Sequence, residues 1–163
     1  MPFQSSVNLQ QAAAVAGDFA SANPRASVVA HEGGLVAGTG GVTVGNFAWA
    51  TGNTVLNSGT GAPTGFVHRE QGSALITTYL AETGNLIPAG FAMNLMRTGD
   101  YWVAVTVTTA TVGQKAFAKL TDGTVQFAAA GATVSGYVET PFFCSGFPVG
   151  GTGAVGELVS ITY

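Results

Sequence analysis

The sequence has few ionised side chains. Only 8% of its 163 residues are charged, whereas about 25% is usual for a soluble domain. The mean hydropathy is positive, yet no run approaches the ~20 apolar residues that a membrane helix needs. A surface so poor in charge is weakly protected against association. We therefore expect other subunits to cover much of it; the alternative is a small, stable β-domain that presents Thr, Ser, Asn and Gly to water.

Basic residues and cysteine are equally scarce. The five Lys and Arg residues are spread along a chain of net charge −3, so no cluster exists to neutralise nucleic-acid phosphates. The single cysteine, Cys144, excludes an internal disulfide. No base and orienting group accompany it as a nucleophile requires, so we expect a small buried side chain. The N-terminus carries no positively charged region before an apolar run, which predicts no secretory signal.

Glycine and β-branched residues are abundant, and both favour strands joined by tight turns. The stretch 99–127 shows this best. Residues 101–108 alternate with a period of two, which places Tyr101, Val103, Val105 and Val107 on one face of a strand.

A hairpin should follow this strand. Asp122-Gly123 predicts a type I′ turn. A two-residue loop pairs Leu120 with Val125 and Ala118 with Phe127, and those four side chains then share one face, which fixes the register.

Other short strands are spaced regularly between glycines. They are predicted at 27–31, 35–37, 42–49, 54–56, 66–70, 75–79, 91–96, 133–139 and 157–163, with a Phe142-Phe143 segment among the last ones. Together they predict an all-β fold, a jelly-roll-like β-sandwich or barrel of short strands. We expect one domain over 31–163 and an extended N-terminal arm over 1–30, because Gly17 and Asn23-Pro24 stop any helix in the alanine run before them. The arm either lies along a neighbouring subunit or packs on its own domain.

No motif carries a convincing chemistry. Residues 151–156 match G-x-G-x-x-G, but the remaining residues read as a strand and not as the helix that a dinucleotide site needs. His31 and His68 are the only histidines and form no His-x-His pair for a metal. The eight acids are dispersed, and nothing favours paired-carboxylate catalysis. We expect no enzyme activity, cofactor or metal.

The order of several short pieces is similar to that of the structural cement, or capsid decoration, proteins of tailed bacteriophages. The pieces are residues 17–25, 41–45 with 47–49, 63–69, 86–90, 99–103, 112–115, 122–125, 139–140 and 156–159. The resemblance implies a β-rich, jelly-roll-like protein on the outer surface of an icosahedral head, made in the bacterial host cytoplasm. It also implies partners: the major capsid protein, whose neighbouring subunits it would bridge, and other copies of itself, with a dimer favoured and a trimer possible.

Aromatic side chains and one arginine are the candidate anchors for the capsid or for self-association, because such residues dominate binding energies. The candidates are Phe3, Phe19, Trp49, Phe66, Arg69, Trp102, Phe142 and Phe143. Neither nucleic acid nor membrane is an expected partner. The main alternative is a carbohydrate-binding module of a virion or cell surface, in which Trp49, Trp102 or Tyr101 would stack on sugars. A small cupin-like metal enzyme is a further alternative.

Overall fold

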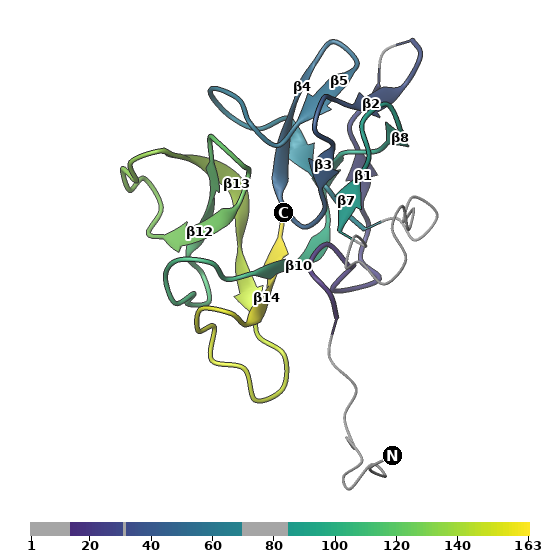
Figure 1. The fold of residues 1–163 in the computed structure, drawn as a ribbon. Helices are drawn as coiled ribbons and strands as arrows, with labels where there is room; N and C mark the ends of the chain where they lie inside the picture. The colour runs from purple at the N-terminus through teal and green to yellow at the C-terminus, as the bar shows by residue number, and fades with distance from the viewer. Residues whose placement is uncertain (1–13, 31, 70–84) are drawn as a thin grey trace, which may run out of the picture.

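The computed structural model describes residues 14–30, 32–69 and 85–163. Within these ranges the chain forms strands, turns and loops and contains no helix (Figure 1). The predicted all-β fold is therefore confirmed, whereas its jelly-roll topology stays a prediction. No described segment is a helix long and apolar enough to cross a membrane.

One sheet has seven short strands. Their spatial order is β1 (Ala26–Ser27), β9 (Met96–Thr98), β6 (Gly65–Phe66), β4 (Phe47–Thr51), β5 (Thr54–Leu56), β2 (Leu35–Ala37) and β8 (Ala92–Met93). All neighbours are antiparallel except β2 and β5, which run parallel. A separate two-stranded ladder joins β3 (Val42–Thr43) to β7 (Leu86–Ile87).

The second sheet has five longer antiparallel strands. Their order is β10 (Asp100–Ala104), β14 (Leu158–Thr162), β13 (Tyr137–Gly146), β11 (Lys115–Lys119) and β12 (Val125–Ala128). In Figure 1 it forms the green and yellow half of the molecule, beside the half built around β4 and β5.

The chain itself covers both edges of this five-stranded sheet. Along β10, the Gly17 amide donates to Trp102 O at 2.7 Å and the Trp102 amide donates to Asp18 O at 2.9 Å. Beyond β10 the chain reaches the opposite edge, where the hydroxyls of Thr106 and Thr108 donate to carbonyl oxygens of β12 at 3.1 and 3.3 Å. The sheet therefore curls towards a barrel whose seam is joined by threonine side chains.

An aromatic core joins the two sheets. Phe47 and Phe66 come from the seven-stranded sheet, and Tyr101 and Phe142 from the five-stranded one. The Phe66 ring centroid lies 4.9 Å from that of Tyr101, and the Phe47 centroid lies 5.6 Å from that of Phe142. A second cluster, which includes Val55, covers the other side of the seven-stranded sheet. Strand β4 is thus buried on both faces, which explains its nearly continuous apolar sequence.

The hairpin prediction was right about the face and wrong about the register. Ala118, not Leu120, pairs with Val125, and Ala116 pairs with Phe127. The slip is two residues, so Ala118, Val125 and Phe127 still face the core. The physical reason is a longer loop at Asp122: its carboxylate accepts hydrogen bonds from the Thr124 amide and hydroxyl and so closes a wider turn than the two-residue one.

Several predicted strands are confirmed, with changed ends. Residues 35–37 and 54–56 are strands with the expected bounds. The expected strand 42–49 is interrupted at Gly45, which has a φ of 81°. The strand predicted over residues 101–108 ends at Ala104, the last residue of β10. Val107 therefore lies beyond the strand and is exposed, not on the core face. The predicted strand 75–79 lies outside the described residues.

The described part of the predicted arm, residues 14–30, contacts the domain. Phe19 forms an isolated bridge with Tyr101, and β1 pairs with β9. The Asp100 carboxylate accepts hydrogen bonds from the Ser21 hydroxyl at 2.5 Å and the Asn23 side-chain amide at 2.6 Å. This stretch therefore packs on its own domain, and a reach towards a neighbour stays a prediction for the residues before it.

Candidate functional site

Three of the predicted anchors belong to the core. Phe66, Phe142 and Trp49 have exposed fractions of 0%, 2% and 7%. The indole N–H of Trp49 donates to Gly61 O at 3.0 Å. These side chains are part of the core cluster between the two sheets. An aromatic residue in a strand has the same sequence pattern whether it faces a core or a neighbour.

The other predicted anchors are at least partly accessible, apart from Phe3, which lies outside the described residues. Phe143 is 39% exposed on β13, and Trp102 on β10 is partly exposed. Phe19 packs against the core with the Arg25 guanidinium 3.9 Å above its ring. Arg69 pairs with Asp18 at 3.5 Å, and so it fixes the chain's own N-terminal segment.

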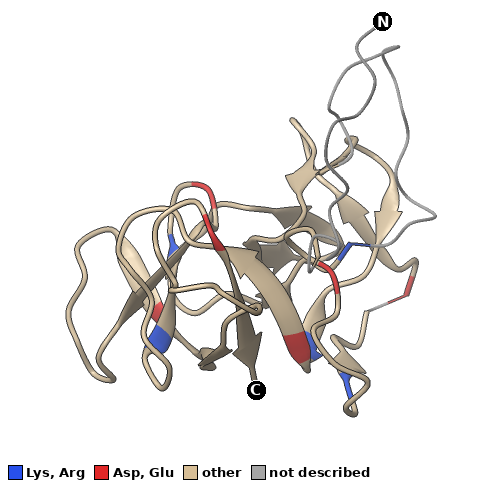
Figure 2. Ribbon diagram, turned by 90° about the horizontal axis from the view of Figure 1, so that it is seen from below, with Lys and Arg blue, Asp and Glu red and all other residues tan. Residues whose placement is uncertain are grey.

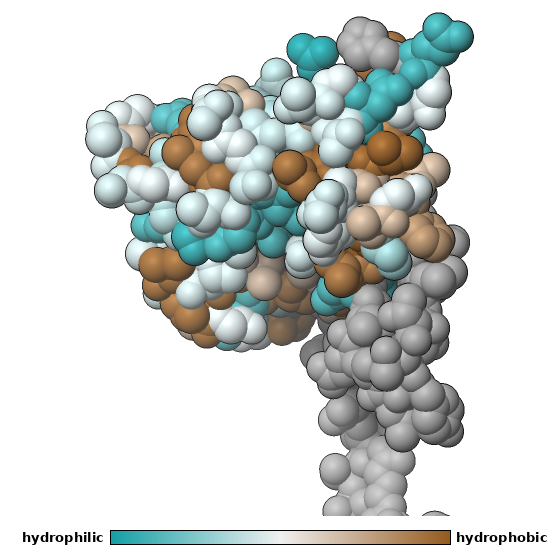
Figure 3. All heavy atoms as spheres, turned by 45° about the horizontal axis from the view of Figure 1, so that its top comes forward, coloured by the Kyte–Doolittle hydropathy of each residue, from teal (hydrophilic) through white to brown (hydrophobic). Residues whose placement is uncertain are grey.

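Sequence reasoning missed an exposed apolar group on two loops. Val107 and Val112 lie on the loop after β10, and Val149 and Val155 lie on the loop before β14; all are more than half exposed. A backbone hydrogen bond from Ala110 N to Gly153 O, 2.8 Å long, joins the two loops. Valine in a β-rich sequence reads as a buried strand residue, so no signal distinguished these four. Figure 3 shows apolar side chains gathered in several patches between polar ones on the face in view.

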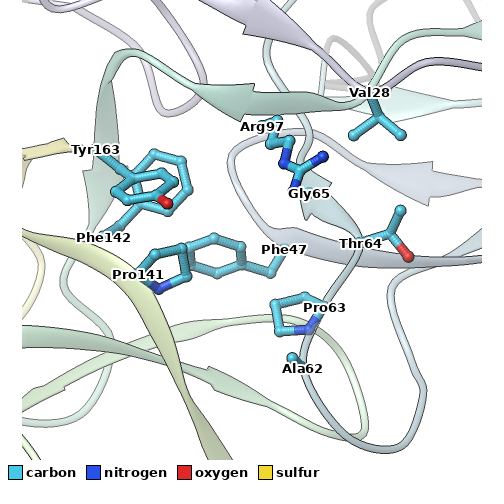
Figure 4. A pocket seen from close by; sticks show the side chains of 10 residues that line it. All are labelled: Val28, Phe47, Ala62, Pro63, Thr64, Gly65, Arg97, Pro141, Phe142 and Tyr163. Carbon is cyan, nitrogen blue, oxygen red and sulfur yellow. The ribbon is translucent and has the colours of Figure 1, made fainter.

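A pocket of about 320 Å³ lies where the two sheets meet (Figure 4). The seven-stranded side contributes Phe47, Gly65 and Arg97 to its lining, and the five-stranded side contributes Phe142 and the last residue, Tyr163. The remaining lining residues are Val28, Ala62, Pro63, Thr64 and Pro141. Five of the ten lining residues therefore carry rings, and one carries a cationic group.

Charged residues are few and scattered over the ribbon (Figure 2). Four of the five basic side chains have a partner in the described chain: Arg25 stacks on Phe19, Arg69 pairs with Asp18, Lys115 donates to Pro141 O and Lys119 pairs with Asp122. Arg97 is exposed and has no such hydrogen bond or ion pair among the described residues.

The candidate metal and nucleophile residues are not grouped in the described part of the chain. The described residues include no group of three or more His, Cys, Asp or Glu that could hold a metal ion; His31 lies outside them. Cys144 is fully buried, and burial raises the pKa of its thiol, which disfavours the nucleophilic thiolate. The loop 151–156 leads into strand β14 and not into a helix. It is closed instead by the Glu157 carboxylate, which accepts from the Thr152 amide at 2.7 Å.

Two of the three aromatic residues proposed to stack on sugars are buried. Tyr101 and Trp49 are buried, with exposed fractions of 0% and 7%, so neither presents a ring face to a ligand. Trp102 alone of the three is partly exposed. No specific observation favours a carbohydrate site.

Fold and surface together define a β-protein with an aromatic core, valines exposed on its loops and sparse charge; in its described part it has no helix and no cluster of metal-binding side chains. The family model of the XM1 gp53 minor capsid protein matches residues 3–163. The chain therefore belongs to this family, and it is a phage capsid-associated protein. The predicted resemblance to capsid proteins of tailed phages is confirmed at this level.

A solved structure supports the same fold. A chain in the capsid of Myoviridae phage XM1 is similar with a TM-score of 0.63 and 16% sequence identity, and the match covers 99% of this chain and 97% of that one. No curated protein matches the sequence.

Proposed function

We propose that the chain is a head cement, or decoration, protein that binds the outer surface of the capsid and stabilises contacts between major capsid protein subunits. The observation that carries the proposal is family membership over residues 3–163. It is supported by a surface with few charges that exposes several large apolar side chains, since contiguous exposed apolar area marks interaction sites.

The proposed mechanism is passive. A packaged genome pushes outward on the shell, and a protein that binds across two subunits resists their separation. A standard interface buries about 1,600 Å², and many copies multiply a modest gain at each site. The accessible anchors are Phe143, Trp102 and the exposed valines of the loops beside β10 and β14. No chemical step is needed, and a non-enzymatic role agrees with the family's structural name.

The partners proposed are the major capsid protein and further copies of the chain, as a dimer or, less favoured, a trimer. Nucleic acid is not among them, because the five basic residues form no cluster and four of them are engaged within the chain. Synthesis in the bacterial cytoplasm followed by attachment to the outside of the head completes the proposal.

Heads that lack this protein provide the test. Purified heads with and without added protein are heated, or diluted rapidly from high to low osmolarity, and released DNA is measured. We expect decorated heads to release their DNA at higher temperature, and a Phe143→Ser variant to protect less. Equal release from bare and decorated heads, with binding verified by sedimentation, would reject the stabilising role.

A further inference from the structure

The pocket between the sheets contains a cationic side chain, Arg97, that forms no ion pair with the described residues. In Figure 4 the Arg97 guanidinium extends into the space between Gly65 and Thr64 on one side and the rings of Phe142 and Tyr163 on the other. No acidic residue lines the pocket in the described part of the chain. The guanidinium therefore has donors that no described residue of the chain accepts.

The chemistry of an arginine side chain favours a carboxylate as its binding partner. Its planar fork binds a carboxylate through two parallel hydrogen bonds, and it is hydrated more weakly than a lysine ammonium. The apolar walls strengthen such a pair, because they exclude water from one side of it. The chain itself has a net charge of −3, so a pocket lined by one cationic and no acidic side chain is a local exception that would orient an acidic partner.

The rest of the lining specifies what should accompany the carboxylate. Tyr163, Pro63 and Pro141 offer accessible ring surfaces, and the almost fully buried rings of Phe47 and Phe142 complete this part of the lining. A phosphate would leave most of these walls without a complementary contact. A volume of about 320 Å³ is at the small end of ligand pockets, which suits one apolar side chain together with a carboxylate.

We propose that this pocket receives an acidic segment of the shell protein, in which an Asp or Glu side chain pairs with Arg97 and an adjacent apolar side chain packs on the rings. This inference rests on the proposed function and names the part of the partner that is recognised. The occupied pocket would contact both sheets at once, through Arg97 on β9 and Pro141 on β13.

Three variants test the assignment on heads that lack the protein. Arg97→Gln removes the charge at an exposed position, and Arg97→Lys keeps the charge without the fork. Ala62→Trp fills the pocket from an exposed loop. Lys119→Gln is the matched control, since it removes one positive charge outside the lining. Circular dichroism and thermal melts verify that each variant is folded.

We expect Arg97→Gln and Ala62→Trp to weaken binding at least about tenfold, as the loss of a charge-assisted pair implies, with Arg97→Lys between them and the parent and Lys119→Gln equal to the parent. Parent protein that binds heads while Arg97→Gln and Ala62→Trp bind equally well would overturn the inference and leave the proposed function standing. Failure of the parent to bind would overturn the proposed function itself.

A second measurement locates the carboxylate on the shell. Heads are treated with a carbodiimide and glycinamide, which convert exposed carboxylates to amides. The parent should lose as much affinity for treated heads as Arg97→Gln loses for untreated ones, and Arg97→Gln should lose nothing further. Undiminished binding of the parent, or an equal further loss by the variant, would contradict the assignment.

Discussion

Replacement of Gly123 by alanine should separate the tip of the β11–β12 hairpin from strand β4. Gly123 has a φ of 70°, and a Cβ at this position would lie 2.0 Å from the backbone oxygen of Phe47. The hairpin tip is held on β4 by the Phe47 amide, which donates to Gly123 O at 2.8 Å, and by the Asn46 side-chain amide, which donates to Asp122 O at 3.2 Å.

The expected cost follows from these contacts. A left-handed backbone conformation costs an alanine about 1–2 kcal/mol. The tip must also move away from a backbone atom, which cannot yield as a flexible side chain would, and both hydrogen bonds are lost at about 1 kcal/mol each. We expect the free energy of unfolding to fall by about 3–4 kcal/mol and the melting temperature to fall by roughly 10 °C.

Gly131→Ala supplies the control. Gly131 has a similar φ of 74°, but a Cβ added there would meet open space, with no described atom beyond its chain neighbours within 4 Å. Its replacement should cost only the backbone strain, about 1–2 kcal/mol. Urea unfolding of the purified chains, followed by tryptophan fluorescence and circular dichroism, measures both. Equal losses in the two variants would refute the idea that the tip is locked against β4.

Three further predictions concern other parts of the fold. Burial alone would raise the pKa of Asp100, but hydrogen bonds from Ser21, Thr162 and Asn23 outweigh it, and the pKa is lowered in the folded chain. The Asp100 carboxylate should therefore stabilise the fold above the ordinary aspartate pKa. This contribution should be lost as the pH falls through the lowered pKa of the folded state. Asp100→Asn should reduce the fall in the free energy of unfolding at low pH, measured with urea, and should speed tryptic cleavage after Arg25. An unchanged fall at low pH would contradict this role of Asp100. The Cys144 thiol is fully buried, so it should not react with Ellman's reagent in the native protein and should react after unfolding in guanidinium. Rapid labelling of the native protein would show that the core opens. Replacing Thr106 and Thr108 by valine should cost about 1 kcal/mol each in urea unfolding, whereas Thr109→Val should cost nothing comparable, and equal effects would mean that the seam bonds contribute no stability.

The sequence was most informative where one face of a strand is buried and the other is not. The alternation of Tyr101, Val103 and Val105 predicted a buried face, and all three are nearly inaccessible. It failed at Val107, because the chain leaves the strand at Ala104 to reach β12. The turn residues Asp122 and Gly123 marked the hairpin, but the number of loop residues depended on hydrogen bonds that a two-residue turn pattern does not encode.

The interaction surface was harder to predict, for a physical reason. Phe66 and Phe143 are both aromatic residues in β-strands, yet one is fully buried and the other is 39% exposed. Which one faces outward depends on how two sheets share a core, and no local pattern records that. Arg97 was not singled out, because a lone arginine has meaning only once the pocket rings and the partners of the other basic side chains are known.

The covered edges of the five-stranded sheet bear on how many copies can be crowded together. A free strand edge is a template on which another chain can add, which is the first step towards fibres. Here residues 17–20 cover β10, the hydroxyls of Thr106 and Thr108 reach β12, and the outer strands of the other sheet, β1 and β8, are only two residues long. Covered and short edges of this kind disfavour edge-to-edge pairing of these two sheets when many copies lie close together.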